Sequence, residues 1–389
     1  MKGTVHYETR GEIALLSIDN PPVNPLSSGV RQGLFDGMTK ALADEAVKAV
    51  VITGLNRAFI AGADISEFGA AASEGVGLGE ALEIMENSTK PVIAAINGTA
   101  FGGGLETALC CDYRIAAPTA PVGLPEVKLG LLPGAGGTQR LPRLIGAQAA
   151  LKAIVSGDPI MAPQAQKLGI VDRIAEGDIV EEGIKYAEEI VAAGSATRKI
   201  RDLTDKIAGD KGNTAVFENA AAQLNKTNRG QFAPAQILKC VEAAVNADSF
   251  DAGMAVERTC FAACMQDPQR EALIHIFFAE RAANKIPGLS KEDPLIDINK
   301  GSVIGSGTMG GGIAMCFANA GIPVRLHDNN AENLAKGLKV IEGNYARTVS
   351  KGRLTQEAMD KRMSLIIPTE NFDDLGDADV VIEAVYENL

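Results

Sequence analysis

The chain has 389 residues, of which 46% are hydrophobic and 22% are charged, a composition typical of globular proteins with more than one domain. Its formal net charge of -12 would repel phosphate backbones and anionic lipids, which argues against non-specific nucleic-acid binding. The amino terminus lacks the pattern of a signal peptide, and no run of about 20 apolar residues could span a bilayer, so we expect an intracellular protein.

Short apolar strands alternate with helices in the first part of the chain. Strands are predicted over Ile13–Ile18 and Val47–Thr53, and a helix between them is indicated by apolar residues four apart, namely Val30, Leu34, Met38 and Leu42. The pattern recurs with a strand over 91–96, a helix over 105–110 and a strand over 113–116. Such alternation predicts an α/β fold.

Two glycine-rich segments follow predicted strands, and we expect each to lead into a helix. They are Phe59–Ile65 and Asn97–Glu106. A helix start leaves backbone N–H groups unpaired, and glycine lets a ligand approach that backbone closely. Two such N–H groups aimed at one point would polarise a carbonyl oxygen and stabilise an enolate.

A second carboxylate follows in a turn rich in proline and glycine. Glu126 lies within this turn, which continues to Thr138. Two carboxylates in one cavity can divide acid and base roles, because burial and mutual repulsion separate their pKa values. A structural role is the alternative for Glu106 taken alone, since it opens a predicted helix whose dipole favours a negative charge.

The pattern becomes helical from about Glu181 to Asn284, and we expect a helical layer packed on the first domain. One helix face is marked by Ile237, Leu238, Val241, Ala244 and Val245. Two prolines, glycine and charged residues then indicate a linker. The predicted divisions are a core over 1–190, a helical extension over 191–284, a linker over 285–295 and a second domain over 296–389.

A G-x-G-x-x-G turn between a strand and a helix start opens the second domain. Its glycines are Gly305, Gly307 and Gly310. A second predicted strand ends at Asp328, the position at which a dinucleotide-binding domain needs a carboxylate to bind the ribose. The helix start would hold a pyrophosphate, and the carboxylate would repel a 2′-phosphate. The pattern therefore indicates NAD rather than NADP, with a purely structural turn as the alternative.

Cysteine and histidine usage does not indicate a metal site. The six cysteines include no C-x-x-C pair, and only three histidines are present. We therefore predict reduced, buried cysteines and no bound metal.

Four motifs in order resemble the crotonase family, and more narrowly the hydratase domain of multifunctional β-oxidation enzymes such as the peroxisomal type 1 group. The match covers about residues 1–290 and includes Phe277–Arg281. It implies an α/β crotonase domain built as a ββα spiral, with a helical extension and then a partial Rossmann domain. The four motifs are Ala61–Asp64, Gly102–Glu106, Leu124–Glu126 and Pro133–Arg140.

The resemblance also implies a mechanism. The N–H groups of Ala63 and Gly103 would hold the thioester oxygen of an acyl-CoA substrate. Glu106 would take a proton from water as it attacks C3 of a trans-2-enoyl-CoA, and Glu126 would deliver a proton to C2. Glu126 would also carry the proton when a 3-enoyl thioester is isomerised to the 2-enoyl form. Contacts with CoA are expected at Ala61, Asp64 and Ile65.

The second domain resembles the NAD domain of 3-hydroxyacyl-CoA dehydrogenases, with residues 379–389 matching a cofactor-contacting strand and turn. The family's catalytic histidine and substrate-binding domain have no counterpart in these 389 residues. We therefore expect this chain not to oxidise 3-hydroxyacyl-CoA. By position, the residues along NAD would be Met309, Asp328, Val385, Tyr386 and Glu387.

Two other functions remain open. One is a different crotonase-fold activity, such as isomerase, decarboxylase or thioester hydrolase, and the other is a catalytically silent subunit that binds acyl-CoA or NAD. The presence of both Glu106 and Glu126 favours hydration. The resemblance further implies a homo-oligomer or a β-oxidation complex partner, with a cytoplasmic location in a bacterium or a peroxisomal location in a eukaryote.

Overall fold

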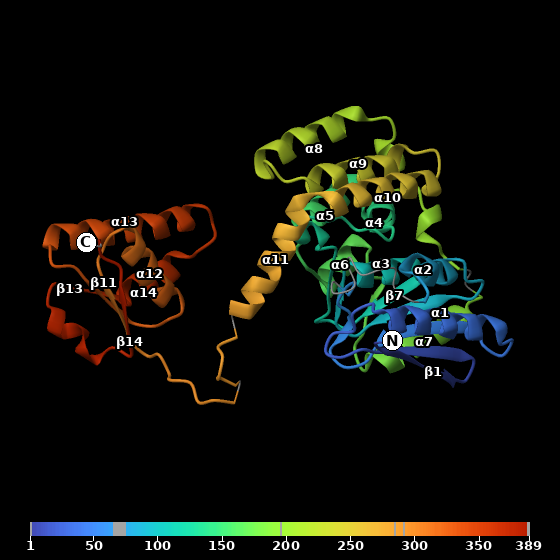
Figure 1. Ribbon diagram of the computed structural model, residues 1–389, viewed down its shortest axis with the longest axis horizontal. Coiled ribbons are helices and arrows are strands. Elements are labelled where there is room, and N and C mark those ends of the chain that lie inside the picture. Colours follow the sequence, from blue (N-terminus) through green and yellow to red (C-terminus); the bar gives the residue numbers. More distant parts are fainter. Residues whose placement is uncertain (1, 65–74, 195–196, 284, 291, 387–389) are drawn as a thin grey trace. The chain divides into compact units, whose positions relative to one another are not determined.

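The chain divides into two units after Lys285, as seen in a computed structural model (Figure 1). Unit 1 spans Met1–Lys285 and unit 2 spans Ile286–Leu389. The division falls at the start of the segment proposed as a linker. The structure describes residues 2–64, 75–194, 197–283, 285–290 and 292–386.

A six-stranded sheet forms the centre of unit 1. Its strand order is β1-β2-β3-β5-β7-β10, in which β1 pairs antiparallel with β2 and the remaining neighbours are parallel. The long apolar runs predicted from the sequence form β2, β3 and β5. The strands are β1 (Thr4–Arg10), β2 (Ile13–Asp19), β3 (Ala49–Gly54), β5 (Val92–Ile96), β7 (Tyr113–Ala116) and β10 (Arg173–Ile174).

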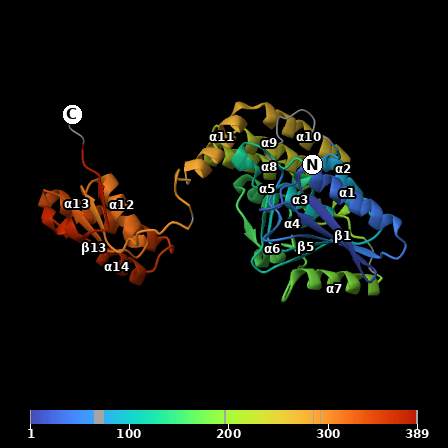
Figure 2. The same cartoon turned by 60° about the horizontal axis from the view of Figure 1, so that its bottom comes forward.

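Both faces of the central strands β3 and β5 are buried, because successive strand residues point to opposite faces and both sets are apolar. On one face, Val51 joins Ile184 of α7 (Ile179–Ala192) in a small core. On the other face, Ile52 belongs to the main core, together with α1 (Ser28–Ala43). Figure 2 shows α7 and α1 on opposite sides of the strands.

A second sheet of four short strands was not predicted from the sequence. Its order is β4-β6-β8-β9, with β4, β6 and β8 parallel. Strands of two or three residues are too short to show a periodicity, which explains why this sheet was missed. The strands are β4 (Ala58–Ile60), β6 (Thr99–Phe101), β8 (Pro121–Gly123) and β9 (Ile160–Met161).

This second sheet aligns three segments that are far apart in the sequence. Parallel neighbours end at the same edge, so the residues that follow β4, β6 and β8 lie side by side. Those residues begin the glycine-rich segments 61–64 and 102–106 and the turn 124–126. The expected strand-to-helix change is confirmed after β6, where α3 (Gly103–Cys110) begins. After Asp64 the chain is not described again until Gly75.

Helices are the only regular elements in the described chain from residue 181 to residue 283, as predicted, and turns and loops connect them. Figure 1 shows α8, α9 and α10 together, and α9 packs against α4, α5, α8 and α10. Of the predicted stripe on α9, only Leu238 is not fully buried. The remaining helices of unit 1 are α2 (Leu78–Glu86), η2 (Glu126–Leu129), α4 (Gly137–Ile145), α5 (Ala147–Ser156), α6 (Ala162–Leu168), η3 (Ile200–Asp202), η4 (Ala208–Asp210), α8 (Thr214–Thr227), α9 (Ala233–Asn246), α10 (Phe250–Gln266) and α11 (Pro268–Ala283).

Unit 2 is a parallel four-stranded sheet with the order β13-β12-β11-β14. The strand order reverses next to β11, and ligands of open α/β sheets bind at the carboxyl ends of strands at such a point. The core includes Val303 and Leu326 from the sheet and Ile341 from α13. The elements are β11 (Gly301–Ile304), α12 (Thr308–Asn319), β12 (Val324–His327), α13 (Ala331–Ser350), α14 (Gln356–Ser364), β13 (Ile366–Thr369), η5 (Phe372–Asp377) and β14 (Val380–Glu383).

Two sequence-based expectations can be compared directly with the side chains. All six cysteines are free, but Cys316 is exposed, so its predicted burial is wrong. It lies on α12 away from the buried face that carries Ala314 and Ala318. Among the described helices, none is both long enough and apolar enough to cross a membrane.

Candidate active site and dinucleotide turn

One cavity of unit 1, about 860 Å³ in volume, gathers most of the residues predicted to act on the substrate. Its wall is formed by the three segments that follow β4, β6 and β8, with α2, α4, α10 and α11 around them. Asp64 is not among the lining residues, and Ile65 lies outside the described residues. The predicted residues that line the cavity are Ala61, Ala63, Gly103, Glu106 and Glu126.

Two unpaired amide groups lie close together in this cavity. A Cβ atom built on Gly103 would lie 3.7 Å from the backbone nitrogen of Ala63. Gly103 is the first residue of α3, where an N–H group has no partner within the helix. Within the described residues, neither amide donates a hydrogen bond. Such a pair of N–H groups can bind an oxygen on which negative charge develops.

Glu106 lies on α3 and is 2% exposed. Its Oε1 atom accepts hydrogen bonds from the amides of Ala135, at 2.7 Å, and Gly137, at 2.8 Å. Burial raises the pKa of Glu106, while these two donors and the nearby Arg140 guanidinium oppose the rise. The ionised form of this carboxyl group is therefore supported from one side by fixed donors.

Glu126 begins η2 and has the opposite surroundings. The residue reaches the cavity, yet its Oε2 atom is buried and has no hydrogen-bond partner in the described part of the chain. Burial, followed by the negative charges of Glu106 and Glu257, raises the pKa of Glu126 well above its ordinary value. The site can thus hold one carboxyl group ionised while the other stays protonated.

This site also contains charged residues that were not identified from the sequence. Arg140 of α4 forms a buried, two-pronged ion pair with Glu86, with nitrogen–oxygen distances of 2.8 and 2.9 Å. Glu257 of α10 is fully buried behind the loop that holds Glu106. One signal was available in the sequence, because Glu257 falls at helical spacing with Cys260 and Cys264 on the buried face of α10.

Besides Arg140, four further basic residues line the same cavity and were not identified from the sequence either. Together with Arg140 they provide cations with which an anionic ligand can pair, in a cavity that five acidic residues also line. Three are arginines and one is a lysine, namely Arg201, Arg258, Arg281 and Lys128.

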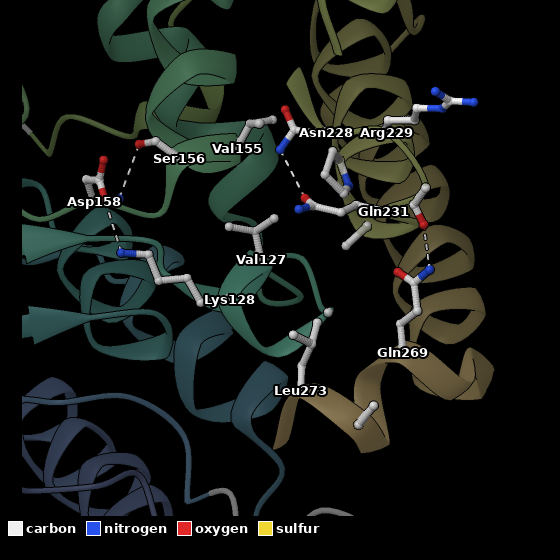
Figure 3. A pocket seen from close by; sticks show the side chains of 15 residues that line it. Val127, Lys128, Val155, Ser156, Asp158, Asn228, Arg229, Gln231, Gln269 and Leu273 are labelled. Carbon is white, nitrogen blue, oxygen red and sulfur yellow. Dashed lines mark hydrogen bonds and ion pairs between the residues drawn. The ribbon is translucent and has the colours of Figure 1, made fainter. Parts of the chain in front are cut away.

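A second cavity of unit 1, about 630 Å³ in volume, contains none of the predicted catalytic residues. Figure 3 shows Asn228, Gln231 and Gln269 near its rim and Val127 within it. Lys128, which also lines the first cavity, bonds to Asp158 at 3.0 Å. With one carboxylate, already paired, this cavity offers no acid and base pair, so we place the chemistry in the first cavity.

The glycine-rich turn of unit 2 lies between β11 and α12. A Cβ atom at Gly310 would lie 1.8 Å from the carbonyl oxygen of Gly305, so only glycine allows this close packing. At Gly307 a Cβ atom would meet nothing within 4 Å, which leaves room for a ligand. Amides at the start of α12 can bind a phosphate here.

Asp328 follows β12 and is tied to the same turn. Its Oδ2 atom accepts hydrogen bonds from the Ser306 amide, at 3.0 Å, and the Ser306 hydroxyl, at 2.6 Å. Partial burial opposes ionisation, but these donors and the Asn330 amide lower the pKa of Asp328 below its ordinary value. The turn and the carboxylate therefore fit a dinucleotide.

The other predicted cofactor contacts are exposed residues that flank the turn or β14, or lie outside the described residues. Met309 is 61% exposed at the start of α12, and Val385 and Tyr386 follow β14 and are also exposed. Glu387 lies outside the described residues. Metal ligands do not cluster in the described ranges, where no group of three His, Cys, Asp or Glu side chains could hold an ion.

Two protein families match this chain. Residues 8–231 match the enoyl-CoA hydratase/isomerase family, and residues 300–389 match the NAD-binding domain of 3-hydroxyacyl-CoA dehydrogenase. These matches confirm the crotonase resemblance and the order of the two domains.

Curated relatives match along nearly the whole chain. The peroxisomal bifunctional enzymes of Cavia porcellus and Homo sapiens are 40% and 39% identical over 387 and 381 residues, each covering 97% of this chain and 52% of the relative. A peroxisomal fatty acid β-oxidation multifunctional protein of Arabidopsis thaliana is 36% identical over 389 residues. The chain spans about half the length of the curated relatives it matches.

Solved structures match unit 1. Carnitinyl-CoA hydratase from Mycobacterium avium aligns with a TM-score of 0.53 and 28% identity over 72% of this chain and 97% of that one. An enoyl-CoA hydratase/isomerase from Pseudoalteromonas atlantica aligns with a TM-score of 0.53 over 74% of this chain and 100% of that one, at 22% identity, which supports the fold alone. The chain belongs to the enoyl-CoA hydratase/isomerase family.

Proposed function

We propose that unit 1 adds water to trans-2-enoyl-CoA and produces 3-hydroxyacyl-CoA, the hydration step of fatty-acid β-oxidation. The observation that carries this proposal is one cavity that contains two unpaired amides and two buried carboxyl groups with opposite hydrogen-bonding surroundings. Membership of the enoyl-CoA hydratase/isomerase family supports the same reaction.

In this mechanism the thioester oxygen binds to the N–H groups of Ala63 and Gly103. Glu106 takes a proton from water while the water oxygen forms a bond to C3. Electrons of the double bond move toward the thioester oxygen, whose charge the two amides stabilise. Glu126 then gives its proton to C2, and proton exchange between the carboxyl groups and solvent restores the starting state.

The hydrogen bonds around the two carboxyl groups support this division of roles. The amides of Ala135 and Gly137 stabilise ionised Glu106, which a base requires. Glu126 lacks a donor at Oε2 and faces the charge of Glu106, so it keeps its proton more readily, as an acid requires. Reversing the roles would leave the ionised group without the donors.

Substrate binding is proposed for the rest of the same cavity. Ala61 lines it and remains a proposed CoA contact, as do Asp64 beside it and Ile65. The CoA phosphates are proposed to bind among the four basic lining residues named above, because they provide the cations that the phosphates need. In a eukaryotic host we propose a peroxisomal location, and we propose a homo-oligomer or a β-oxidation complex as the working form.

The direct test is hydration of crotonyl-CoA by the 389-residue chain. We expect the ultraviolet absorbance of the conjugated thioester to disappear and a product heavier by one water molecule to form. A folded chain that hydrates neither crotonyl-CoA nor a longer 2-enoyl-CoA would contradict the proposed function.

Isomerisation of 3-enoyl-CoA to 2-enoyl-CoA is a second proposed activity, favoured by the unpartnered Oε2 atom of Glu126. In its ionised form Glu126 can take the proton from C2 and return it to C4, and no water needs activation. We therefore expect Glu106→Gln to keep isomerisation of 3-hexenoyl-CoA within about tenfold while hydration falls much further. Equal losses of both activities, measured by ultraviolet absorbance, would contradict this separation.

Unit 2 is proposed to bind NAD. The turn of Gly305, Gly307 and Gly310 would hold the pyrophosphate, and Asp328 would accept a hydrogen bond from the ribose. Met309, Val385, Tyr386 and Glu387 would lie along the cofactor. When bound, NAD supplies a hydride acceptor. Oxidation of 3-hydroxyacyl-CoA is proposed for a protein with the length of the relatives.

NAD binding can be tested with a variant that removes one charge. In Asp328→Asn we expect the Kd for NAD to rise about 10- to 100-fold, because a charge-assisted hydrogen bond is lost. Preference over NADP should also fall, since the repulsion of a 2′-phosphate disappears. Calorimetry on the full chain measures both, with Asp360→Asn on exposed α14 as the control. An unchanged Kd in Asp328→Asn would refute the assignment.

A further inference from the structure

Four consecutive amides link Glu106 to a third buried carboxyl group. The amides of Ala135 and Gly137 donate to Glu106, at 2.7 and 2.8 Å. The amides between and after them, of Gly136 and Thr138, donate to Glu257 at 2.7 and 3.2 Å. The Thr138 hydroxyl also donates to Glu257. The segment is therefore held from two sides by alternate N–H groups.

The local backbone makes this alternation possible. Gly136 is the N-cap of α4 and has a φ of 96°, in the left-handed region where glycine is favoured. A Cβ atom there would also lie 1.8 Å from Nη1 of Arg140. Amides at a helix start have no partners within the helix, and the helix dipole favours nearby negative charge. The amides at and just before the start of α4 therefore donate alternately to Glu106 and Glu257.

Glu257 is placed to act through this segment and not on the substrate. It is 0% exposed and does not line the cavity, so it cannot touch the bound thioester. In the described part of the chain it forms no ion pair, because the nearby cation Arg140 is paired with Glu86. Burial and then the charge of Glu106 raise the pKa of Glu257 to about 8.

The charged and titratable groups that face Glu257 come from four other elements. Their charges set how readily Glu257 ionises and what its own charge does to the site. Arg140 favours the ionised form, whereas the charge of Glu106 opposes it. The facing groups are Glu106 of α3, Arg140 of α4, Cys240 of α9 and Glu126 of η2.

We propose that Glu257 is a positioning residue for hydration: it fixes the segment 135–138 so that two amides hold the Glu106 carboxylate in place. This inference rests on the proposed function of unit 1. Glu257 is bound to the segment that holds Glu106, and its negative charge, once it ionises, raises the pKa of Glu126. Its loss therefore affects both the rate and the pH dependence. A residue with a merely structural role would change stability without moving the pH profile.

The test is the pH dependence of kcat and kcat/KM for crotonyl-CoA in Glu257→Gln. The amide keeps the size of the side chain but places an NH₂ group among donors. We expect kcat to fall about 10- to 100-fold, the loss that displacement of a reacting group produces, with KM nearly unchanged. Above the pKa of Glu257, about 8, the wild-type side chain carries a negative charge that raises the pKa of Glu126, so the alkaline limb of kcat/KM should move to lower pH when this charge is removed.

Glu271→Gln is the matched control, since this side chain is 80% exposed on α11 and we expect wild-type behaviour. Should Glu257→Gln fail to fold, Thr138→Val replaces it. That variant removes a hydroxyl donor that lowers the pKa of Glu257, so a smaller fall in kcat and a shift of the alkaline limb in the same direction are expected.

The outcomes separate the two proposals. An inactive wild-type chain contradicts the proposed function itself. An active wild-type chain whose folded Glu257→Gln variant, or Thr138→Val in its place, keeps the wild-type kcat and alkaline limb overturns the positioning role alone. A loss of kcat without any movement of the alkaline limb also overturns it.

Discussion

Replacing Glu106 with glutamine is expected to lower kcat for crotonyl-CoA hydration by about 10³-fold, within the range for a residue that transfers a proton. Glutamine has nearly the same shape, and its amide oxygen can still accept the hydrogen bonds of Ala135 and Gly137. It cannot take a proton from water. The loss should therefore fall on kcat, while KM stays close to the wild-type value because the contacts with CoA are unchanged.

The controls for this experiment come from the same chain. Glu271→Gln makes the same chemical change on an exposed part of α11 and should leave the rate unchanged. Thermal unfolding of the Glu106→Gln variant shows whether the fold is kept. A folded variant that hydrates crotonyl-CoA within about threefold of the wild-type rate would exclude Glu106 as the base.

Replacing Glu126 with glutamine is expected to lower the rates of both proposed activities strongly. Hydration should fall by about 10²- to 10³-fold, because no acid remains to protonate C2, and isomerisation should fall with it. Rates with crotonyl-CoA and 3-hexenoyl-CoA, measured on the same preparation, test this. Full isomerisation by a variant that no longer hydrates would show that another residue carries the proton.

The pH profile gives the Glu126 variant a second signature. Burial raises the pKa of both carboxyl groups, so both limbs of the wild-type kcat/KM profile should lie above the range of an ordinary glutamate. Protonation of Glu106 lowers the rate on the acid side, and deprotonation of Glu126 lowers it on the alkaline side. Since glutamine does not titrate, Glu126→Gln should keep the acid limb and lose the alkaline limb.

Much of the fold could be predicted because its central strands are long and apolar. The run of apolar residues over Val47–Thr53 predicts a strand, and residues 49–54 form β3 with both faces buried. The second sheet could not be predicted from the sequence, because strands such as β8 (Pro121–Gly123) contain too few residues to show a periodicity. Yet this sheet brings Glu106 and Glu126 together, through the parallel pairing of β6 with β8.

The site residues that lie in motifs directly after β4, β6 and β8 could be predicted from the sequence. The residues that a distant element supplies could not. Glu257 reaches the loop at Gly136 from 121 residues further along the chain, a contact that only the packing of α10 on α4 creates. Glu86 and Arg140 likewise meet across 54 residues. No local sequence pattern predicts such contacts. A glutamate on the buried face of a predicted helix does, however, indicate that its carboxyl group has a buried partner.

A crystal structure of the chain with bound 3-hydroxybutyryl-CoA would test the central claim most directly. We predict the 3-hydroxyl group between the carboxyl groups of Glu106 and Glu126, and the thioester oxygen about 2.7–3.1 Å from the amide nitrogens of Ala63 and Gly103. A thioester bound in the second cavity, or a hydroxyl group that contacts neither carboxyl group, would contradict the account.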